Sequence, residues 1–376
     1  MIAYLTIGDK SSGIFSGQVV DVCNLLSELT KKKVRLISFI SIREYRVEKK
    51  KIKQVYPYST VLPMFPRLKN WKWNIVLLFI ATLFKKYNTI ICRNSIPANL
   101  GLMLKKVSKI DRVVLDGRGA EYEQYVEYKM LSDVNLEQKL FQVEKQAVLK
   151  VDYRIAVSEE LVKYWKKTFN YQSNKHVVIP CTLNRRHENF VLDKINRKVL
   201  GFNDDDVVLV YCGSVSGWQS FDKMFAFVKQ QFDSDPKVKL LLLTKKIGLI
   251  EELMNVYPNR IICNWCSEED VMSMMSIGDY GLIIREDTIT NKVASPVKFA
   301  EYLFAGLSVI ISERIGDYNS FLKENNCGVT YSDVSGKLRK LAEKEKNSNR
   351  ELAKIYFSKN GNIIKEKYQK LLKKRE

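Results

Sequence analysis

The sequence predicts an α/β fold made of two doubly wound domains, each built on its own parallel sheet. Short apolar runs rich in Val, Ile and Leu recur along the chain, and amphipathic helical segments separate them. Such runs are typical of strands buried on both faces, and their alternation with helices is typical of parallel sheets. The chain has 376 residues, 46% of them hydrophobic, which is enough for two domains with separate cores.

The N-terminal half begins this alternation at its first residues. The run from Ile2 to Ile7 predicts a strand, and the loop after it carries Gly13 and Gly17, which allow a close approach of the backbone to a ligand. Three more strands are predicted in KVRLISFI, NTIICRN and RVVLDGRGA. Residues 136–165 then indicate a helix, a strand and a second helix with Ser158 as its N-cap.

Two of these strands end in polar and charged side chains. Arg93 and Asn94 follow one strand, and Asp116 and Arg118 follow the next. Because ligands of open parallel sheets bind outside the carboxyl ends of the strands, we expect all four residues beside a cleft. Arg118 can hold a phosphate group there, or it can form a structural salt bridge with Asp116.

The balance of charge is strongly basic. Lys and Arg number 62 against 42 Asp and Glu, which gives a formal net charge of +20. Nucleic acid, an anionic membrane surface and phosphorylated substrates are the partners that fit such a charge. The basic clusters lack a recognisable module for reading nucleic acid, so we do not expect nucleic acid as the partner.

One basic cluster adjoins an apolar segment. Trp71 and Trp73 flank Lys72 just before residues 75–84. A bilayer takes about 20 residues to cross, so we expect this short segment to be a buried core helix and the region around Lys72 to touch anionic membrane from outside. MIAYLTIG has no basic n-region of a signal peptide. We therefore expect a cytoplasmic protein, peripheral on the inner face of the membrane if it associates with one.

No metal or redox site is predicted. The seven cysteines lie scattered through apolar runs, as small buried hydrophobes do. Cys263 and Cys266 form one CxxC, but no second pair accompanies it, and the chain has only two histidines. The acids 204–206 precede a strand and are interpreted as a polar turn. We expect neither a metal nor a cofactor.

The apolar pattern lapses after residue 185, and we place the domain boundary there. Residues 1–185 form the predicted N-terminal domain and residues 186–355 the C-terminal domain. Residues 356–376 are predicted as a helix that packs back on the N-terminal domain through apolar residues at helical spacing. In the second domain, strands are predicted in VVLVYC, KVKLLLLT, RIICNW, DYGLIIRE and LSVIIS.

The stretch NKVASPVKFAEYLFAG predicts a short, well-delimited helix before the last of these strands. Ser295 is a preferred N-cap, and Pro296 suits the first helical position. Gly306 favours the left-handed conformation that ends a helix. We therefore expect a helix from Pro296 to about Ala305.

The first turn of this helix is a candidate anion site. The amides of Val297 and Lys298, together with the Lys298 ammonium group, favour a phosphate there. Glu301 lies one turn further on the same face, roughly 5 Å along the axis at a rise of about 1.5 Å per residue. That distance suits a ribose next to a pyrophosphate. Arg285 ends the preceding strand and is expected beside the same site.

SPVKFAEYLFAGLSVI resembles the donor-site helix of family 4 glycosyltransferases. That resemblance implies the GT-B fold, two Rossmann-like domains facing across a cleft. It also implies that Glu301 binds the ribose of a nucleotide sugar and that the amides before it bind the diphosphate. The family usually has a second Glu eight positions earlier, where this chain has Val293. The loop with Gly17 is similar to the family's first loop, which approaches the acceptor and the sugar.

A further diphosphate contact is implied after VVLVYC. Family 4 enzymes often carry an Arg and a Lys there, whereas this chain has Gly213, Ser214 and Gly217. We therefore expect Arg285, Lys298 and the helix amides to hold most of the diphosphate, with the backbone of this turn close to the ligand.

The resemblance to family 4 glycosyltransferases implies a retaining hexosyltransferase of cell-surface polysaccharide synthesis, and the lack of metal ligands in the sequence predicts that it works without a metal. Its donor is expected to be a nucleotide-diphosphate sugar of the UDP or GDP type, and its acceptor a carbohydrate or a lipid-linked molecule. The expected catalytic residues are Arg285, Lys298 and Arg118, and the expected donor contacts are Gly17, Gly213, Ser214, Ser295, Val297, Lys298 and Glu301. Two alternatives remain open, a sugar-nucleotide epimerase of the same fold and a non-enzymatic basic nucleic-acid-binding protein.

Overall fold

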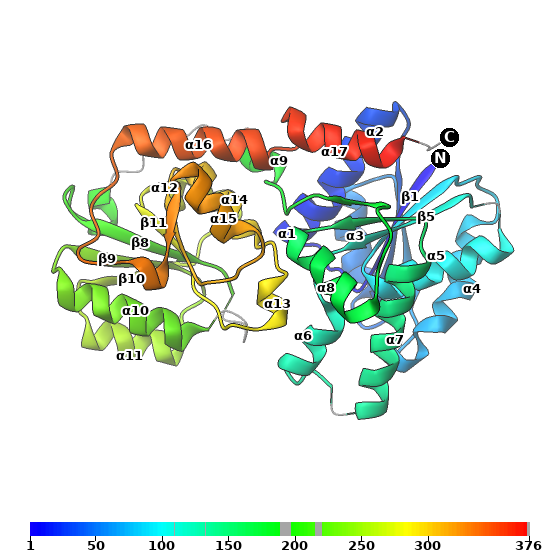
Figure 1. Ribbon diagram of the computed structural model, residues 1–376, viewed down its shortest axis with the longest axis horizontal. Coiled ribbons are helices and arrows are strands. Elements are labelled where there is room, and N and C mark those ends of the chain that lie inside the picture. Colours follow the sequence, from blue (N-terminus) through cyan, green and yellow to red (C-terminus); the bar gives the residue numbers. More distant parts are fainter. Residues whose placement is uncertain (109, 132, 189–196, 215–219, 374–376) are drawn as a thin grey trace. The chain divides into compact units, whose positions relative to one another are not determined.

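The chain folds into two compact units, each a parallel sheet flanked by helices (Figure 1). The computed structural model describes residues 1–108, 110–131, 133–188, 197–214 and 220–373. Unit 1 contains residues 1–185 and 362–376, and unit 2 contains residues 186–361. The chain thus returns to unit 1 after residue 361. From the sequence we expected the helix that packs back on the N-terminal domain to begin at residue 356.

Unit 1 has seven parallel strands in the order β3-β2-β1-β4-β5-β6-β7. The strands are β1 (Ile2–Ile7), β2 (Arg35–Ser41), β3 (Ser59–Met64), β4 (Thr89–Arg93), β5 (Arg112–Gly117), β6 (Tyr153–Ala156) and β7 (His176–Val178). The chain moves outward from β1 to β3 and then crosses back to β4, so the order reverses between β1 and β4. Ligands of open parallel sheets bind at such a switch point. The sequence predicted five of these strands and missed β3 and β7.

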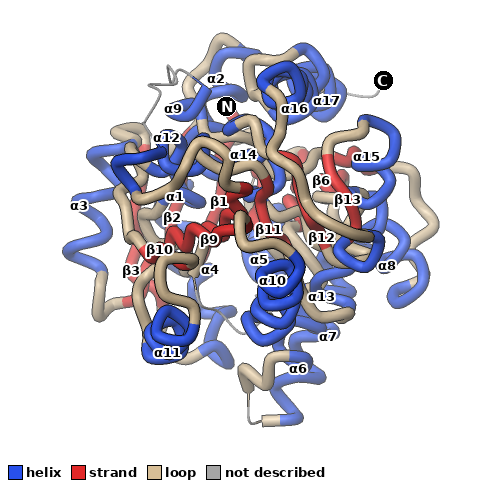
Figure 2. The backbone as a smooth tube through the Cα atoms, turned by 90° about the vertical axis from the view of Figure 1, so that its left-hand side faces the viewer, coloured by secondary structure: helices blue, strands red, loops and turns tan. Residues whose placement is uncertain are grey.

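Helices cover both faces of this sheet, as the strands and helices of Figure 2 show. They are α1 (Gly13–Phe15), the π-helical segment η1 (Ser16–Val20), α2 (Asp21–Thr30), α3 (Tyr45–Val55), the 3₁₀ segment η2 (Leu68–Trp73), α4 (Asn74–Thr82), α5 (Ser95–Val107), α6 (Glu121–Glu127), α7 (Val134–Lys150), α8 (Glu159–Phe169) and α17 (Asn362–Leu372). Ser158 caps α8 as predicted, because its hydroxyl accepts a hydrogen bond from the Leu161 N–H (3.0 Å). Helix α17 contacts α2 and β7 and buries Ile364, Tyr368 and Leu371 in the unit 1 core.

Helix α4 is not the buried core helix that residues 75–84 led us to expect. Its inner side packs against α5 and β3 and buries Leu78. Its outer side is exposed, with Ile80 58% accessible, and Phe84, two residues past the helix end, is 92% accessible. The apolar run is continuous, so its composition could not show that only one side would be covered. Within the described ranges, no helix is long and apolar enough to cross a membrane.

Unit 2 has six parallel strands in the order β10-β9-β8-β11-β12-β13, with the reversal between β8 and β11. The strands are β8 (Val207–Cys212), β9 (Val238–Leu243), β10 (Ile261–Cys263), β11 (Tyr280–Ile283), β12 (Ser308–Ile311) and β13 (Gly328–Thr330). The helices are α9 (Arg185–Glu188), which starts at the boundary, η3 (Arg197–Leu200), α10 (Phe221–Ser234), α11 (Gly248–Val256), α12 (Val271–Ser276), α13 (Ile289–Lys292), α14 (Val297–Ala305), α15 (Tyr318–Asn325), η5 (Tyr331–Asp333) and α16 (Glu343–Phe357). All strands predicted for this domain are present, and β13 was not predicted.

Helix α14 lies where it was predicted, but its N-cap is Pro296 and not Ser295. Pro296 has an extended backbone (φ −64°, ψ 124°) and so occupies the capping position itself. The Ser295 hydroxyl lies instead 2.7 Å from the hydroxyl of Tyr318. Gly306 ends the helix with a φ of 93°, as the sequence predicted.

Tyr302 fixes α14 to the sheet of unit 2. Its ring covers Gly281 of β11 so closely that a Cβ at position 281 would stand 2.3 Å from it. Its hydroxyl accepts a hydrogen bond from the Cys212 N–H of β8 (2.9 Å). One side chain therefore sets the position of α14 against two neighbouring strands.

Candidate active site

The candidate donor site lies at the start of α14 in unit 2. Lys298 stands in the first turn, and its ammonium group bonds the thiol of Cys212, the last residue of β8. The N–H of Phe299 donates to the carbonyl of Pro296 (3.1 Å). The amides of Val297 and Lys298 precede it at the helix N-terminus, a position that favours an anion.

Lys298 and Glu301 form a close ion pair at this helix end. The Lys298 Nζ lies 2.6 Å from the Oε2 of Glu301. Burial acts to lower the pKa of Lys298, but the neighbouring groups, Glu301 foremost through its charge and its hydrogen bond, together outweigh burial and the pKa is raised. Burial acts to raise the pKa of Glu301, but its neighbours, Lys298 foremost through its charge and its hydrogen bond, together outweigh burial and that pKa is lowered. Both side chains are therefore charged at neutral pH.

His187 is a third member of this cluster. It lies on α9, and its Nδ1 is 3.7 Å from the Oε1 of Glu301. Burial lowers the pKa of His187 from its usual 6.5, so the ring is neutral at pH 7. The Nδ1 is buried without a hydrogen-bond partner among the described residues. Because no hydrogen bond joins the two atoms at this distance, hydroxyl groups of a ligand can bond to both.

Arg285 follows β11 and lies near the same helix end. Its backbone N–H donates to the hydroxyl of Ser312 (2.7 Å), and its guanidinium Nη1 donates to the Oδ1 of Asn291 (3.4 Å). Burial raises the pKa of Tyr211 on β8, while the charges of Arg285 and Lys298 both act to lower it. The charges of both cations therefore act on the same tyrosine.

The turn after β8 adds backbone groups to this edge of the sheet. The Gly213 N–H donates to the carbonyl of Leu243 (3.3 Å), and the Ser214 carbonyl accepts a hydrogen bond from the Tyr211 hydroxyl (2.7 Å). Ser214 itself is exposed. Gly217 lies outside the described residues.

Arg118 lies in unit 1, where three neighbours hold its guanidinium. Its Nη1 is 3.4 Å from the Oδ1 of Asp116. Its Nη2 donates to the Oε1 of Gln18 (3.0 Å) and lies 2.9 Å from the Sγ of Cys181. These contacts fit the structural salt bridge that the sequence left open beside phosphate binding.

Gly17 stands next to this cluster for a reason of packing. A Cβ at position 17 would lie 3.3 Å from the Cβ of Asn184. The next residue, Gln18, donates from its Nε2 to the carbonyl of Thr182 (2.7 Å) and also bonds Arg118. The close approach that the glycine allows is therefore to another part of unit 1.

Arg93 and Asn94, at the end of β4, are less fully bonded. The Nε of Arg93 lies 3.5 Å from the Oδ1 of Asp9, and its Nη1 lies 3.9 Å from the Oδ2 of Asp116. Neither nitrogen has a hydrogen-bond partner among the described residues. Asn94 has φ 73° and ψ 176°, a conformation that is costly outside glycine and that concentrates at functional sites.

The tyrosine of β1 belongs to the same network, since the Tyr4 hydroxyl donates a hydrogen bond to Asp116. Burial raises the pKa of Asp9, although Arg93 acts to lower it. Asp9 comes two residues after the end of the first strand, so the strand-end argument that found Asp116 could also have found Asp9. His187 had no such signal, because it lies in RRHENF, where the apolar pattern stops.

The predicted site residues thus fall into two groups. Unit 2 brings together Gly213, Ser214, Arg285, Ser295, Val297, Lys298 and Glu301 near the start of α14. Gly17 and Arg118 lie in unit 1. The buried side chain of Val293 is apolar, so no second carboxylate stands at that position. In the part of the chain that the structure describes, no three His, Cys, Asp or Glu residues are grouped as metal ligands.

Solved structures share this architecture over nearly the whole chain. Sucrose-phosphate synthase from Thermosynechococcus elongatus is 14% identical over 99% of this chain and 98% of its own, with a TM-score of 0.69. HepE from Anabaena, solved in complex with UDP, is 12% identical over 99% of both chains, with a TM-score of 0.70. A putative UDP-N-acetylglucosamine 2-epimerase from Listeria monocytogenes is 10% identical over 97% of this chain and 94% of its own, with a TM-score of 0.55. No family model matches the sequence, and no curated protein matches it.

These similarities confirm the predicted fold class. The chain has the GT-B fold, with two α/β domains whose sheets of seven and six strands are entirely parallel.

Proposed function

We propose that this protein is a glycosyltransferase that moves a sugar from a nucleotide-diphosphate sugar, of the UDP or GDP type, to a carbohydrate or lipid-linked acceptor. The observation that carries the proposal is the cluster of Lys298, Glu301 and His187 at the start of α14. The fold supports it, because HepE of the same fold has been solved with UDP and with UDP-glucose. The wider role that we propose is the synthesis of cell-surface polysaccharide.

In this proposal the start of α14 holds the nucleotide diphosphate. The amides of Val297 and Lys298 and the Lys298 ammonium group face the phosphates, and Arg285 adds a second cation. The ribose hydroxyls donate to Glu301 and to the unbonded Nδ1 of His187, 3.7 Å apart in the cluster. Gly213, Ser214 and Ser295 contribute contacts from the loops beside the helix.

The chemical step is the departure of the diphosphate from the sugar. Negative charge grows on the phosphate oxygens as the glycosidic bond breaks, and donors fixed in advance stabilise it. Arg285 and Lys298 supply the positive charge that stabilises these oxygens, so the reaction is proposed to proceed without a divalent cation. The sugar is proposed to keep its anomeric configuration. Arg118, expected from the sequence to be catalytic, is proposed here as a positioning residue that holds Asp116 at the end of β5.

Thermal unfolding with added nucleotides tests the donor site. UDP, GDP and CMP, with their sugar conjugates, are compared at equal concentration, because a ligand at 100 times its Kd stabilises the native state by about 2.7 kcal/mol. One diphosphate family is expected to raise the melting temperature, with less effect in Glu301→Gln and full effect in the exposed control Lys229→Ala. A chain that none of these nucleotides stabilises contradicts the proposal.

A sugar-nucleotide epimerase is the alternative that one observation favours. Asp9 and Asp116 are carboxylates close to Arg93 in unit 1, and acids of this kind can exchange protons with a sugar. An epimerase converts its sugar nucleotide without an acceptor. Incubation with the stabilising sugar nucleotide alone, followed by chromatography of the products, separates the two activities.

A further inference from the structure

Helix α4 carries a continuous apolar stripe on its exposed side. Side chains spaced by three and four residues lie on one face of a helix. The stripe follows this spacing from Trp73, which ends η2, through Val76 and Ile80 of α4 to Leu83 and Phe84 just past the helix end, with side chains 47% to 92% exposed. Figure 1 shows α4 at the outside of unit 1 beside α5. Large apolar side chains gathered in this way mark a binding surface.

The start of α4 is held firmly. The Oδ1 of Asn74 accepts a hydrogen bond from the Phe65 N–H (2.9 Å), and its Nδ2 donates to the carbonyl of Trp71 (2.8 Å). Leu78 and Thr82 are buried on the opposite side. The stripe is therefore presented by a packed helix and not by a frayed segment.

All charged residues in the sequence around the stripe are basic. Residues 49–110 contain 13 Lys and Arg and no Asp or Glu. Lys69 and Lys72 precede the stripe, and Lys85 and Lys86 follow it. An apolar helix face with lysines at both of its ends is complementary to a surface that is apolar inside and negatively charged at its boundary.

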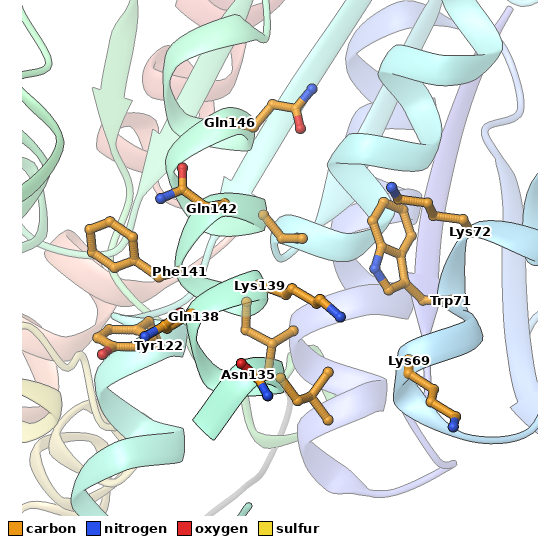
Figure 3. A pocket seen from close by; sticks show the side chains of 13 residues that line it. Lys69, Trp71, Lys72, Tyr122, Asn135, Gln138, Lys139, Phe141, Gln142 and Gln146 are labelled. Carbon is orange, nitrogen blue, oxygen red and sulfur yellow. The ribbon is translucent and has the colours of Figure 1, made fainter. Parts of the chain in front are cut away.

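A basic pocket of about 920 Å³ opens at the N-terminal end of the stripe, between η2 and α7 (Figure 3). The described residues that line it include Lys69, Lys72 and Lys139 and no Asp or Glu. Lys139 of α7 and the indole of Trp71 point toward one another across it. The Lys72 ammonium group lies 5.9 Å from the centre of the Trp71 ring. This combination suits a phosphate group attached to an apolar body.

We propose that the α4 stripe and this pocket together dock the protein onto a bilayer containing anionic lipids. The stripe enters the boundary of the acyl chains, and the pocket takes a lipid phosphate. A protein partner fits less well, because lysine is depleted in protein interfaces but enriched on membrane-surface helices. The biological purpose of the docking rests on the proposed function, because an enzyme with a lipid-linked acceptor meets that acceptor at a membrane. The experiments that test the docking do not depend on the proposed function.

Vesicle co-sedimentation of the full chain tests the docking. Binding is expected to vesicles of phosphatidylcholine with phosphatidylglycerol, to be much weaker with phosphatidylcholine alone, and to fall as salt rises. Free inorganic phosphate tests the pocket by itself, and phosphate binding that Lys139→Ala abolishes, without binding of the wild type to anionic vesicles, would make the pocket a free-phosphate site and overturn the membrane assignment. No binding to anionic vesicles, or equal binding to both kinds, also overturns it.

Matched variants separate the stripe from general charge. Phe84→Glu and Ile80→Glu are expected to weaken vesicle binding by about tenfold or more, whereas Val256→Glu, an exposed apolar site in unit 2, leaves it unchanged. Lys72→Ala and Lys139→Ala are expected to cost about fivefold each, against no change in Lys229→Ala. Stripe and pocket variants that bind like their controls overturn the proposal.

Two further readouts keep this test apart from that of the proposed function. Nucleotide stabilisation is expected to be the same in Ile80→Glu and the wild type, so a failure of one test leaves the other intact. Sedimentation velocity addresses the remaining occupant of the stripe, a second copy of the chain. Self-association that Ile80→Glu disperses, without vesicle binding by the wild type, contradicts membrane docking.

Discussion

The two units present charged clusters that are satisfied to different degrees. In unit 1, the guanidinium of Arg118 contacts Asp116, Gln18 and Cys181, and this side chain is nearly closed to further partners, although two nitrogens of the neighbouring Arg93 are not hydrogen-bonded within the described residues. In unit 2, Lys298 and Glu301 pair closely, yet the Nδ1 of His187 faces the Glu301 carboxylate without a hydrogen bond. A ligand gains more at His187 than at Arg118, because at His187 it can satisfy a buried group that the protein leaves unbonded.

This difference separates residues that stabilise the fold from residues that are available to bind a ligand. Asp116 is 3% exposed and receives contacts from Tyr4, Arg93 and Arg118. Its loss should fall on stability. The members of the α14 cluster should instead affect binding and turnover. The predictions below test that division, from the largest effect to the smallest.

Asp116→Ala is expected to destabilise the protein by about 3–5 kcal/mol, because it leaves the buried Arg118 without its carboxylate and removes one of the two carboxylates near Arg93. Urea denaturation monitored by circular dichroism measures the loss. Asp204→Ala is the matched control, since its exposed pair with Lys198 (3.2 Å) should be worth less than about 1 kcal/mol. If Asp116→Ala has normal stability but has lost its activity, the unit 1 cluster has a catalytic role and not a structural one.

Lys298→Ala and Arg285→Ala are each expected to lower kcat by roughly 100- to 1,000-fold, because each removes a fixed cation from the departing diphosphate. KM should change far less, and Lys229→Ala should leave both constants unchanged. The melting temperature of each variant is needed beside the kinetics, since Lys298→Ala also leaves Glu301 without its partner. Folded variants with near wild-type kcat would remove the case for a donor site at α14.

Glu301→Gln and His187→Ala are expected to weaken nucleotide binding through the ribose. A hydrogen bond to a charged group is worth about 1.5–3 kcal/mol and a neutral one about 0.5–1.5 kcal/mol, so Glu301→Gln should have the larger effect. Calorimetry with the ribonucleotide and its 2′,3′-dideoxy analogue measures both. The variants should bind the analogue as the wild type does, and an equal loss for both ligands would place Glu301 and His187 away from the ribose.

The smallest effect expected is a dependence of binding on mildly acid pH. The folded pKa of His187 lies below its usual 6.5, so the neutral ring contributes fully above about 6.5 and its contribution is lost as pH falls through the folded value. A protonated ring would pair with Glu301 and withdraw both groups from the ligand. Affinity for a nucleotide sugar, measured across this range, should fall in the wild type and stay flat in His187→Ala. The same fall in both would assign the titration elsewhere.

Much of the fold followed from local patterns. The parallel strands of both units are continuous apolar runs, and α14 is bounded by a proline and a left-handed glycine that the sequence displays. The strands β3 and β7 escaped prediction because β3 is only half-buried and contains a proline, while β7 spans three residues. Helix α4 was expected to be buried but is exposed on one side, because apolar composition alone does not reveal which side of a helix packs against the rest of the protein.

The candidate site was predictable only where chemistry and local structure coincide. Lys298 and Glu301 are three residues apart on one helix, so their spacing in the sequence predicts that their side chains come into contact. His187 is more than a hundred positions away and reaches Glu301 through tertiary structure. Ser295 was misassigned for a related reason, because its hydroxyl is drawn to Tyr318, a residue distant in sequence.

The fit of Tyr302 over Gly281 restricts how such a protein can diversify. Any side chain at position 281 would collide with the ring, and loss of the ring would open a cavity beside a glycine that cannot fill it. The two positions can therefore change only together. The loops around residues 213–214 and 285–295 carry no such constraint from this pair, so a new nucleotide preference is more readily acquired by recombining those loops on an unchanged helix than by altering the helix itself.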